Sequence, residues 1–136
     1  MNKSRIERVV RYLLVAMLAI FGANFFLHFM PQPAPPEEGG RFLGALGGAG
    51  YVFPTIGVVF LLAALLLVAR RVVLALLLVA PIALNILSYH FRFDLSGIGP
   101  GGLLSALLLV LAAIHAKEIA VLFQSSTSNT TERRQA

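Results

Sequence analysis

The chain has no cysteine, and only 12% of its 136 residues are charged. Without cysteine it cannot form a disulfide, present a thiolate nucleophile or bind a metal through thiolates. Any redox chemistry would therefore need a borrowed cofactor or the thiols of a partner protein. Hydrophobic residues make up 58% of the chain, whereas soluble domains are about half apolar and about a quarter charged. This balance indicates a membrane protein, and the length indicates one domain.

The formal net charge is +5, which would suit a nucleic-acid partner if the basic residues formed one binding face. Instead, the lysines and arginines lie at the ends of apolar runs, a pattern that reports membrane topology. We therefore exclude nucleic acid as a partner and expect a lipid bilayer around the chain.

Four apolar segments reach the length of about 17–25 residues that a helix needs to cross a bilayer. They are residues 13–30, 51–69, 72–89 and 103–123. Backbone polar groups in lipid must bond within their own segment, so these segments are predicted to be helices. The expected fold is an all-α membrane protein, a four-transmembrane-helix bundle in a single domain of residues 1–123. The basic and apolar start resembles a secretory signal, but its apolar character continues without a prompt cleavage site, which favours an uncleaved first span.

The basic residues also predict the orientation of the four spans. Nine of the eleven lysines and arginines lie on one side, and only Arg41 and Arg92 lie on the other. Because short cytoplasmic flanks are enriched in basic residues, both termini are predicted to be cytoplasmic. The turn at Arg70 and Arg71 is short enough to make the second and third spans antiparallel neighbours. The polar tail, residues 124–136, is predicted to be disordered.

The loop after the first span carries the sequence PPEE at residues 35–38. Proline suits the first position of a helix, and acidic side chains are favoured in its first turn. A short interfacial helix is therefore predicted between the first two spans. Glycines at every fourth position from Gly40 to Gly48 predict a flat ridge for close backbone contact. The alternative is a flexible glycine loop.

Polar side chains inside apolar spans need partners, because burying them in lipid is costly. Asn24 and His28 are four residues apart and so share one face near the outer end of the first span. The third span carries further polar residues at the same depth. The predicted outer-leaflet polar cluster, a candidate cofactor-binding site, consists of Asn24, His28, Asn85, Tyr89 and His90.

Three interpretations of this cluster are open. The side chains could hydrogen-bond across helices and fix their register. They could instead donate hydrogen bonds to the carbonyls of a quinone or another amphipathic small molecule. A metal or haem site is the third, but two histidines without a third ligand are weak support, and we expect no metal.

No catalytic site is predicted from the sequence. The glycines between residues 97 and 102 have the spacing of a dinucleotide fingerprint but join two apolar spans, where that motif cannot form. A proton relay through His115 and Glu118 would lie far from the polar cluster, and the first three spans carry no acid in their interiors. Catalysis by this chain on its own is therefore not expected.

Three stretches occur in order: FGANFFLHFMPQPAP, FLGALGGAGYVFPTIGVVFLLAALLLV and APIALNILSYHFRFDLSGI. Together they resemble the DoxX-like family of small bacterial integral membrane proteins, over about residues 9 to 123. The resemblance implies a four-helix bundle in a bacterial inner membrane, and the founding branch of the family is a subunit of a quinone-linked thiosulfate oxidoreductase. Many members carry a lysine and a glutamate at what look like the positions of Phe25 and Phe60. If those groups pair in other members, two aromatic residues replace both halves here.

Three functions follow from these observations. The first is a non-catalytic membrane subunit or assembly component, whose polar cluster is structural or faces a partner. The second is a quinone-interacting subunit of a membrane redox complex. The third is a small transporter. The sequence shows neither paired interrupted helices nor an inverted repeat, which counts against this function. The expected partners are the bilayer and either a second copy or a membrane redox protein, and quinone is the cofactor that the second function would use.

Overall fold

The structure, a computed structural model, describes residues 2–124. The predicted disordered tail lies outside these residues apart from Gln124. The described chain is helical and contains no strand. Its helices are α1 (Lys3–Leu27), α2 (Glu37–Gly48), α3 (Val52–Val68), α4 (Val72–Phe93), the 3-10 helix η1 (Leu95–Gly97), α5 (Gly99–Ile114) and a terminal helix, Ala116–Gln124. The all-α prediction is confirmed.

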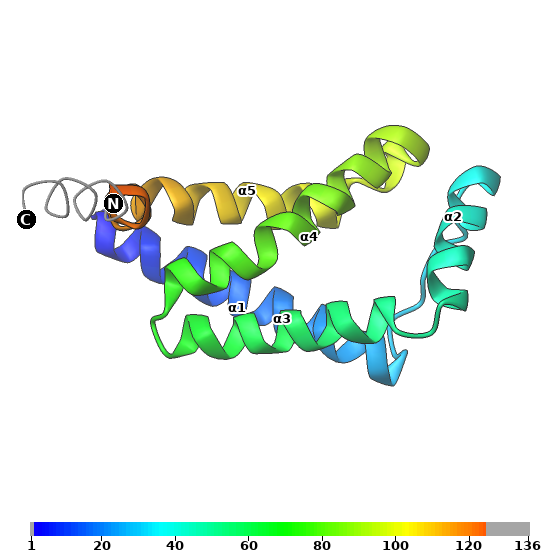
Figure 1. The fold of residues 1–136 in the computed structure, drawn as a ribbon, viewed down its shortest axis with the longest axis horizontal. Helices are drawn as coiled ribbons and strands as arrows, with labels where there is room; N and C mark the ends of the chain where they lie inside the picture. The colour runs from blue at the N-terminus through cyan, green and yellow to red at the C-terminus, as the bar shows by residue number, and fades with distance from the viewer. Residues whose placement is uncertain (1, 125–136) are drawn as a thin grey trace, which may run out of the picture.

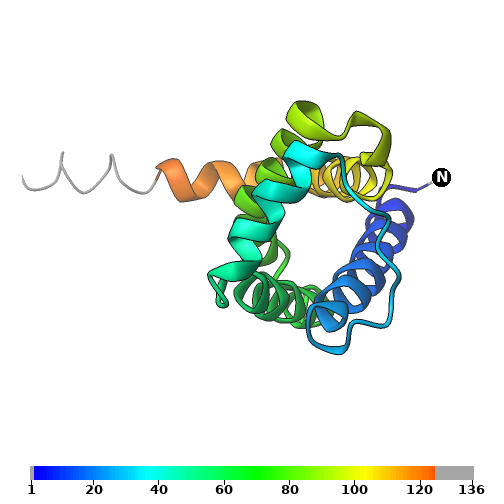
Figure 2. The same ribbon diagram turned by 90° about the vertical axis from the view of Figure 1, so that its right-hand side faces the viewer.

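Helices α1, α3, α4 and α5 form a ring (Figure 2). Both α1 and α4 pack against α3 on one side and α5 on the other, so α1 and α4 face each other across the ring. Helix α2 crosses one end of the ring and contacts α3 and α4 (Figures 1 and 2). We call this the distal end. The opposite end, which holds the start of α1 and the α3–α4 turn, is called the basic end.

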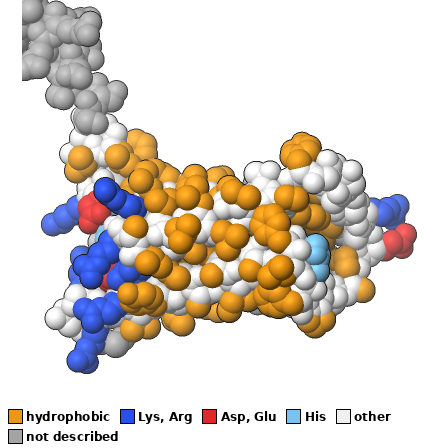
Figure 3. All heavy atoms as spheres, turned by 90° about the horizontal axis from the view of Figure 1, so that it is seen from below, with side chains coloured by type: hydrophobic (Ala, Val, Ile, Leu, Met, Phe, Trp, Pro, Cys, Tyr) orange, Lys and Arg blue, Asp and Glu red, His pale blue; other side chains and the backbone are white. Residues whose placement is uncertain are grey.

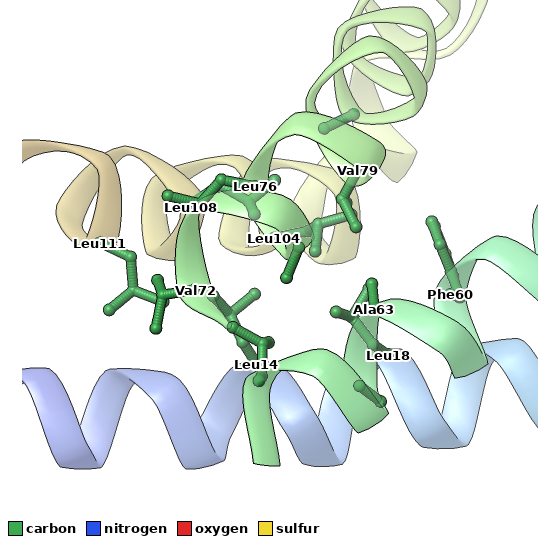
Figure 4. Packing of buried hydrophobic residues seen from close by; sticks show 14 of the residues in the cluster. Leu14, Leu18, Phe60, Ala63, Val72, Leu76, Val79, Leu104, Leu108 and Leu111 are labelled. Carbon is green, nitrogen blue, oxygen red and sulfur yellow. The ribbon is translucent and has the colours of Figure 1, made fainter. Parts of the chain in front are cut away.

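Aliphatic side chains fill the middle of the ring (Figure 4). The largest fully buried ones are Leu14, Leu18, Leu67, Val79 and Leu111. Large apolar side chains also cover the outside, where Leu109 is 70% exposed and Leu65 is 67% exposed. Figure 3 shows hydrophobic side chains along the length of one face, with the charged ones gathered at its two ends. So much apolar surface is unfavourable in water and is compatible with a membrane environment.

Two helices, α1 and α4, are by themselves long and apolar enough to cross a membrane. The number rises to four only if two bent pairs count as one span each: α2 with α3, bent by 83°, and α5 with the terminal helix, bent by 69°. Both bends lie at ends of the ring, the first at the distal end and the second at the basic end (Figure 1). Transporter sites use helices interrupted near the middle of the membrane, whereas both of these bends lie at ends of the ring.

The last predicted span, residues 103–123, is wrong as a single straight helix. Helix α5 ends at Ile114, and the chain turns at His115 before the terminal helix begins. His115 Nδ1 lies 3.0 Å from Glu118 Oε1, so a polar side-chain contact accompanies the turn. The residues on both sides of this contact are apolar, so a hydropathy average does not reveal the bend.

The first span is also shorter than predicted at its distal end. Helix α1 ends at Leu27 rather than reaching Met30, because His28 adopts a left-handed conformation with φ 50°. The predicted short turn at Arg70 and Arg71 is confirmed. Between α3 and α4, Arg70 has φ 60°, and the Arg71 N–H donates to the Leu66 carbonyl at 2.7 Å.

The predicted short helix after the first span is confirmed as α2. Pro36 precedes it, and its first turn contains both glutamates. The predicted ridge of glycines is wrong, however, because a Cβ on Gly44 or Gly48 would meet no atom within 4 Å. The close approach occurs instead at Gly39, where a Cβ would lie 2.6 Å from the Tyr89 hydroxyl. Helix α2 therefore turns a different face to the bundle than its glycine spacing suggests.

Candidate functional site

Asn24 and His28 form the end of α1. The Asn24 side-chain oxygen accepts a hydrogen bond from the Met30 N–H at 2.8 Å, and its backbone carbonyl accepts one from the His28 N–H at 3.0 Å. The His28 side chain is exposed. Together these contacts cap the helix and direct the chain into the proline-rich loop.

Asn85 lies on an exposed face of α4. Its amide donates to the carbonyl of Pro81, one helical turn earlier, at 2.9 Å. Ser88 makes the same kind of bond to the Leu84 carbonyl at 2.8 Å. Both side chains therefore satisfy their polar groups on their own helix.

Tyr89 and His90 are the members of the predicted cluster that touch each other, with ring centroids 5.3 Å apart. The Tyr89 ring also stacks on Phe42 of α2 at 6.1 Å. Its hydroxyl is buried without a hydrogen-bond partner. His90 is held by a 2.9 Å contact between Nδ1 and the Asp94 carbonyl.

The structure divides the five predicted residues into two groups. Asn24 and His28 lie on or just after α1, whereas Asn85, Tyr89 and His90 lie on α4, across the ring. Within residues 2–124, no side-chain hydrogen bond joins one group to the other. The network expected across the helices therefore consists of separate local contacts.

Helix α2 is attached to α4 by an aromatic contact that we call the α2–α4 seam: Gly39, Phe42, Tyr89 and Phe93. Phe42 stacks on Phe93 with centroids 5.5 Å apart. Arg92 Nη1 lies 3.7 Å from Glu38 Oε2 above this seam, and both side chains are about two-thirds exposed. An exposed pair of this kind contributes little, so the rings carry most of the attachment.

A second polar group lies at the basic end, and the sequence had singled out only its members His115 and Glu118. Arg11 is only 3% exposed although it is charged. Its Nε donates to Glu7 Oε1 at 2.9 Å, and its Nη1 donates to the Leu67 carbonyl at 3.0 Å. The acid–base spacing of four residues on one helix was the available signal. That spacing does not show that the Arg11 side chain is buried against the end of α3.

His115 extends this group to α5. Its Nδ1 contacts Glu118, and its Nε2 is buried 3.9 Å from Glu7 Oε1 without a hydrogen bond. We call Glu7, Arg11, His115 and Glu118 the basic-end cluster. No three His, Asp or Glu side chains of the described chain are placed to hold a metal. The cluster links the start of α1 to the end of α3, the end of α5 and the start of the terminal helix through charge and hydrogen bonding.

Two open grooves lie on the outside of the bundle. One, of about 370 Å³, is lined by Arg8, Val9, Tyr12 and Leu13. The other, of about 420 Å³, is lined by Lys3, Ile6, Val110, Ala113 and Ile114. Neither includes a residue of the predicted polar cluster.

Phe25 and Phe60, the two positions singled out by the family resemblance, are in contact. Their rings meet edge to face, with centroids 6.2 Å apart and planes at 69°. Phe60 is 3% exposed, so this contact lies inside the bundle between α1 and α3.

Comparison of the chain with protein-family models, curated proteins and solved structures gave no match.

Proposed function

We propose that the chain is a four-span membrane protein of the DoxX-like family that acts as a non-catalytic subunit or assembly component. In this arrangement α1, α3, α4 and α5 each cross the membrane, with both termini in the cytoplasm. Helices α3 and α5 contain 17 and 16 residues, so at about 1.5 Å each they fall a few ångströms short of the roughly 30 Å hydrocarbon core. Local thinning of the bilayer accommodates such a mismatch at modest cost.

The observation that carries this proposal is where the polar groups of the predicted cluster bind. Asn24 bonds the loop after α1, Asn85 bonds a carbonyl of its own helix, and His90 contacts the carbonyl of Asp94. Ligand sites bring a few polar groups together from different elements toward one space. Groups that are satisfied locally instead stabilise helix ends and turns, which suits a structural part.

The contact between Phe25 and Phe60 gives further support. In the family pattern these positions carry opposite charges, and a buried pair of charges is the kind of group that a membrane enzyme uses. Replacing both by rings that pack together keeps the contact between α1 and α3 but removes the charges. A protein that retains the bundle without this pair is better suited to assembly than to catalysis. Its partner would be a second copy or a membrane redox protein.

One observation favours the alternative of a quinone-interacting subunit. The Tyr89 hydroxyl is buried without a partner, a state that costs about 1–3 kcal/mol. A quinone carbonyl would accept a hydrogen bond from it, beside the His90 ring. Gly39 lies against the hydroxyl, so this alternative requires α2 to move away from α4.

Quinone content separates the two functions. The full chain is purified in mild detergent, extracted with organic solvent and analysed for quinone by chromatography. The subunit proposal expects no stoichiometric quinone and no rise in melting temperature when quinone is added. Stoichiometric quinone that is lost in Tyr89→Phe, but kept in the exposed control Tyr51→Phe, would overturn it in favour of the redox subunit.

A further inference from the structure

The terminal helix, Ala116–Gln124, leaves the bundle sideways at the basic end (Figure 2). It makes an angle of 69° with α5. The bend contains neither proline nor glycine. It is accompanied by the contact between His115 and Glu118, and by a hydrogen bond of 3.0 Å from the Ile119 N–H to the His115 carbonyl. The direction of the helix is therefore tied to the basic-end cluster.

The terminal helix is amphipathic. Ile119, Leu122 and Phe123 follow the spacing i, i+3, i+4 and so lie on one face, while Lys117 lies on the opposite face, which also carries the exposed Val121. Ile119 packs against the core of the bundle. Leu122 and Phe123 are 52% and 75% exposed, so the outer half of the apolar face has no protein cover.

The surface beside this helix is positively charged. Within the described part of the chain, the exposed basic residues of the basic end are Lys3, Arg5, Arg8, Arg70, Arg71 and Lys117. The acids described there are Glu7, which pairs with buried Arg11, and Glu118, which contacts His115. This surface complements the anionic headgroups of a cytoplasmic membrane leaflet, which attract each nearby lysine or arginine by about 1 kcal/mol.

The described part of the terminal helix is too short to form a straight span. Its nine described residues extend only about 14 Å, less than half of a hydrocarbon core of about 30 Å. Lys117 and Glu118 are exposed directly after the bend, and charged side chains are costly in the hydrocarbon region. The lipid interface meets both demands, since it accepts charges on one face of a helix and apolar side chains on the other.

We infer that the terminal helix lies in the membrane plane and binds anionic phospholipid at the basic end. Leu122 and Phe123 enter the boundary between headgroups and acyl chains, and Lys117 lies among the headgroups. The amphipathic face, the bend and the surrounding charge all identify a lipid surface as the occupant. This inference rests on the proposed four-span arrangement, so its test must distinguish failure of the anchor from failure of the spans.

Site-directed spin labelling provides that test, because the chain has no cysteine of its own. Single cysteines replace Phe123, Lys117 and Leu109, all exposed positions, so labels there displace no buried contact. The full chain is reconstituted in phosphatidylcholine vesicles with or without phosphatidylglycerol. Collision of each label with oxygen, which enters lipid, is compared with collision with a water-soluble nickel chelate to give its depth.

We expect the label at position 109 to lie deep in the bilayer. The label at 123 should lie about 5–10 Å below the headgroups, and the label at 117 should contact the nickel chelate. Adding phosphatidylglycerol should increase the lipid-bound fraction at position 123. Lys117→Gln in the 123-labelled chain should reduce the ratio of bound to free helix about fivefold, the effect of one lysine at an anionic surface.

A label at 123 that is as deep as the one at 109 would show that the terminal helix enters the hydrocarbon, against the anchor. A label at 123 that is as accessible to nickel as the one at 117 would show that it leaves the membrane. Spin–spin broadening at 123 that disappears on dilution with unlabelled chain would identify a second copy as the occupant. Each result overturns the inference, whereas nickel access at position 109 would instead overturn the four-span proposal.

Discussion

Some charged residues at the basic end hold helices together, a role that their charge alone does not reveal. In the sequence, Arg11 is one of nine basic residues that report orientation. In the structure it differs from the others because its guanidinium lies between α1 and the last turn of α3. Burial of a charge is tolerated only when the charge is paired and hydrogen-bonded, and Glu7 and the Leu67 carbonyl meet that need. Arg11 therefore joins two helices as well as marking a side of the membrane.

Arg11→Leu should destabilise the bundle, because Glu7 loses its partner and the Leu67 carbonyl loses a donor. The expected loss is about 1–3 kcal/mol. It would be measured as a lower midpoint of thermal unfolding in detergent, followed by circular dichroism. Arg8→Leu, at an exposed position of the same helix, should change the stability by less than about 0.5 kcal/mol. Equal effects of the two substitutions would show that the buried contacts do not stabilise the fold.

Two glycines of α2 should respond in opposite directions to the same substitution. Gly39→Ala places a Cβ against the Tyr89 hydroxyl and the Phe93 Cβ, whereas Gly44→Ala meets open space. Alanine is favoured over glycine in a helix by about 1 kcal/mol, so Gly44→Ala should be neutral or stabilising and Gly39→Ala destabilising. Thermal unfolding measures both changes.

A double variant tests the reason for that difference. Tyr89→Phe removes the hydroxyl that the new methyl group would meet, so Gly39→Ala combined with Tyr89→Phe should recover part of the stability. No recovery would mean that the strain arises elsewhere in the α2–α4 seam.

At the scale of whole helices, α1 and α3 form a close contact of the bundle. A Cβ on Gly57 would lie 2.7 Å from the Phe26 ring, and a Cβ on Gly22 would lie 3.0 Å from Leu61. Small residues let membrane helices approach closely, which strengthens their packing in the absence of a hydrophobic drive. Phe25 and Phe60 then fill the space beside the close approach.

Charges introduced at this interface test the interpretation of Phe25 and Phe60. Phe60→Glu should be strongly destabilising, because it leaves an unpaired acid inside the bundle, a cost of about 2–3 kcal/mol. Adding Phe25→Lys should recover part of this loss by pairing the charges across the 6.2 Å ring separation. The measurement is the yield of folded protein and its unfolding midpoint in detergent. A double variant that is worse than the sum of the single variants would exclude an ion pair at these positions.

At the scale of the molecule, charge and apolar surface follow the length of the bundle. Basic side chains gather at the end holding the start of α1, and hydrophobic side chains cover the length between the ends (Figure 3). Among residues 2–124, the distal end carries two basic residues, Arg41 and Arg92, each beside a glutamate of α2. This asymmetry favours insertion with the basic end in the cytoplasm.

Reporter fusions test that orientation. A reporter active only outside the cytoplasm should be inactive when fused after Arg71 or Phe123 and active when fused after Gln32. A reporter active only inside the cytoplasm should give the reverse pattern. Activity of the external reporter after Phe123 would contradict the four-span topology.

Much of the fold was predictable because it depends on local chemistry. The helix at α2 followed from its prolines and glutamates, and the turn before α4 followed from adjacent arginines between two apolar runs. The polar cluster was predicted less well, because helical spacing places Asn24 and Asn85 at one depth without saying which helices are neighbours. In the ring, α1 and α4 are opposite rather than adjacent. The side chains of α1 and α4 therefore do not form the hydrogen bonds that a shared network would need.

The sequence by itself determined that this protein is helical, apolar and asymmetric in charge, because these properties depend on composition and on the order of residues along the chain. The tertiary structure decided which polar groups are buried and where the helices turn. In it, Arg11 lies against the end of α3, Asn85 faces outward and the chain bends at His115. Each of these outcomes depends on contacts between segments that are distant in sequence or on the balance between competing local hydrogen bonds. Periodicity and hydropathy describe a helix alone, whereas burial is a property of the neighbours that it acquires.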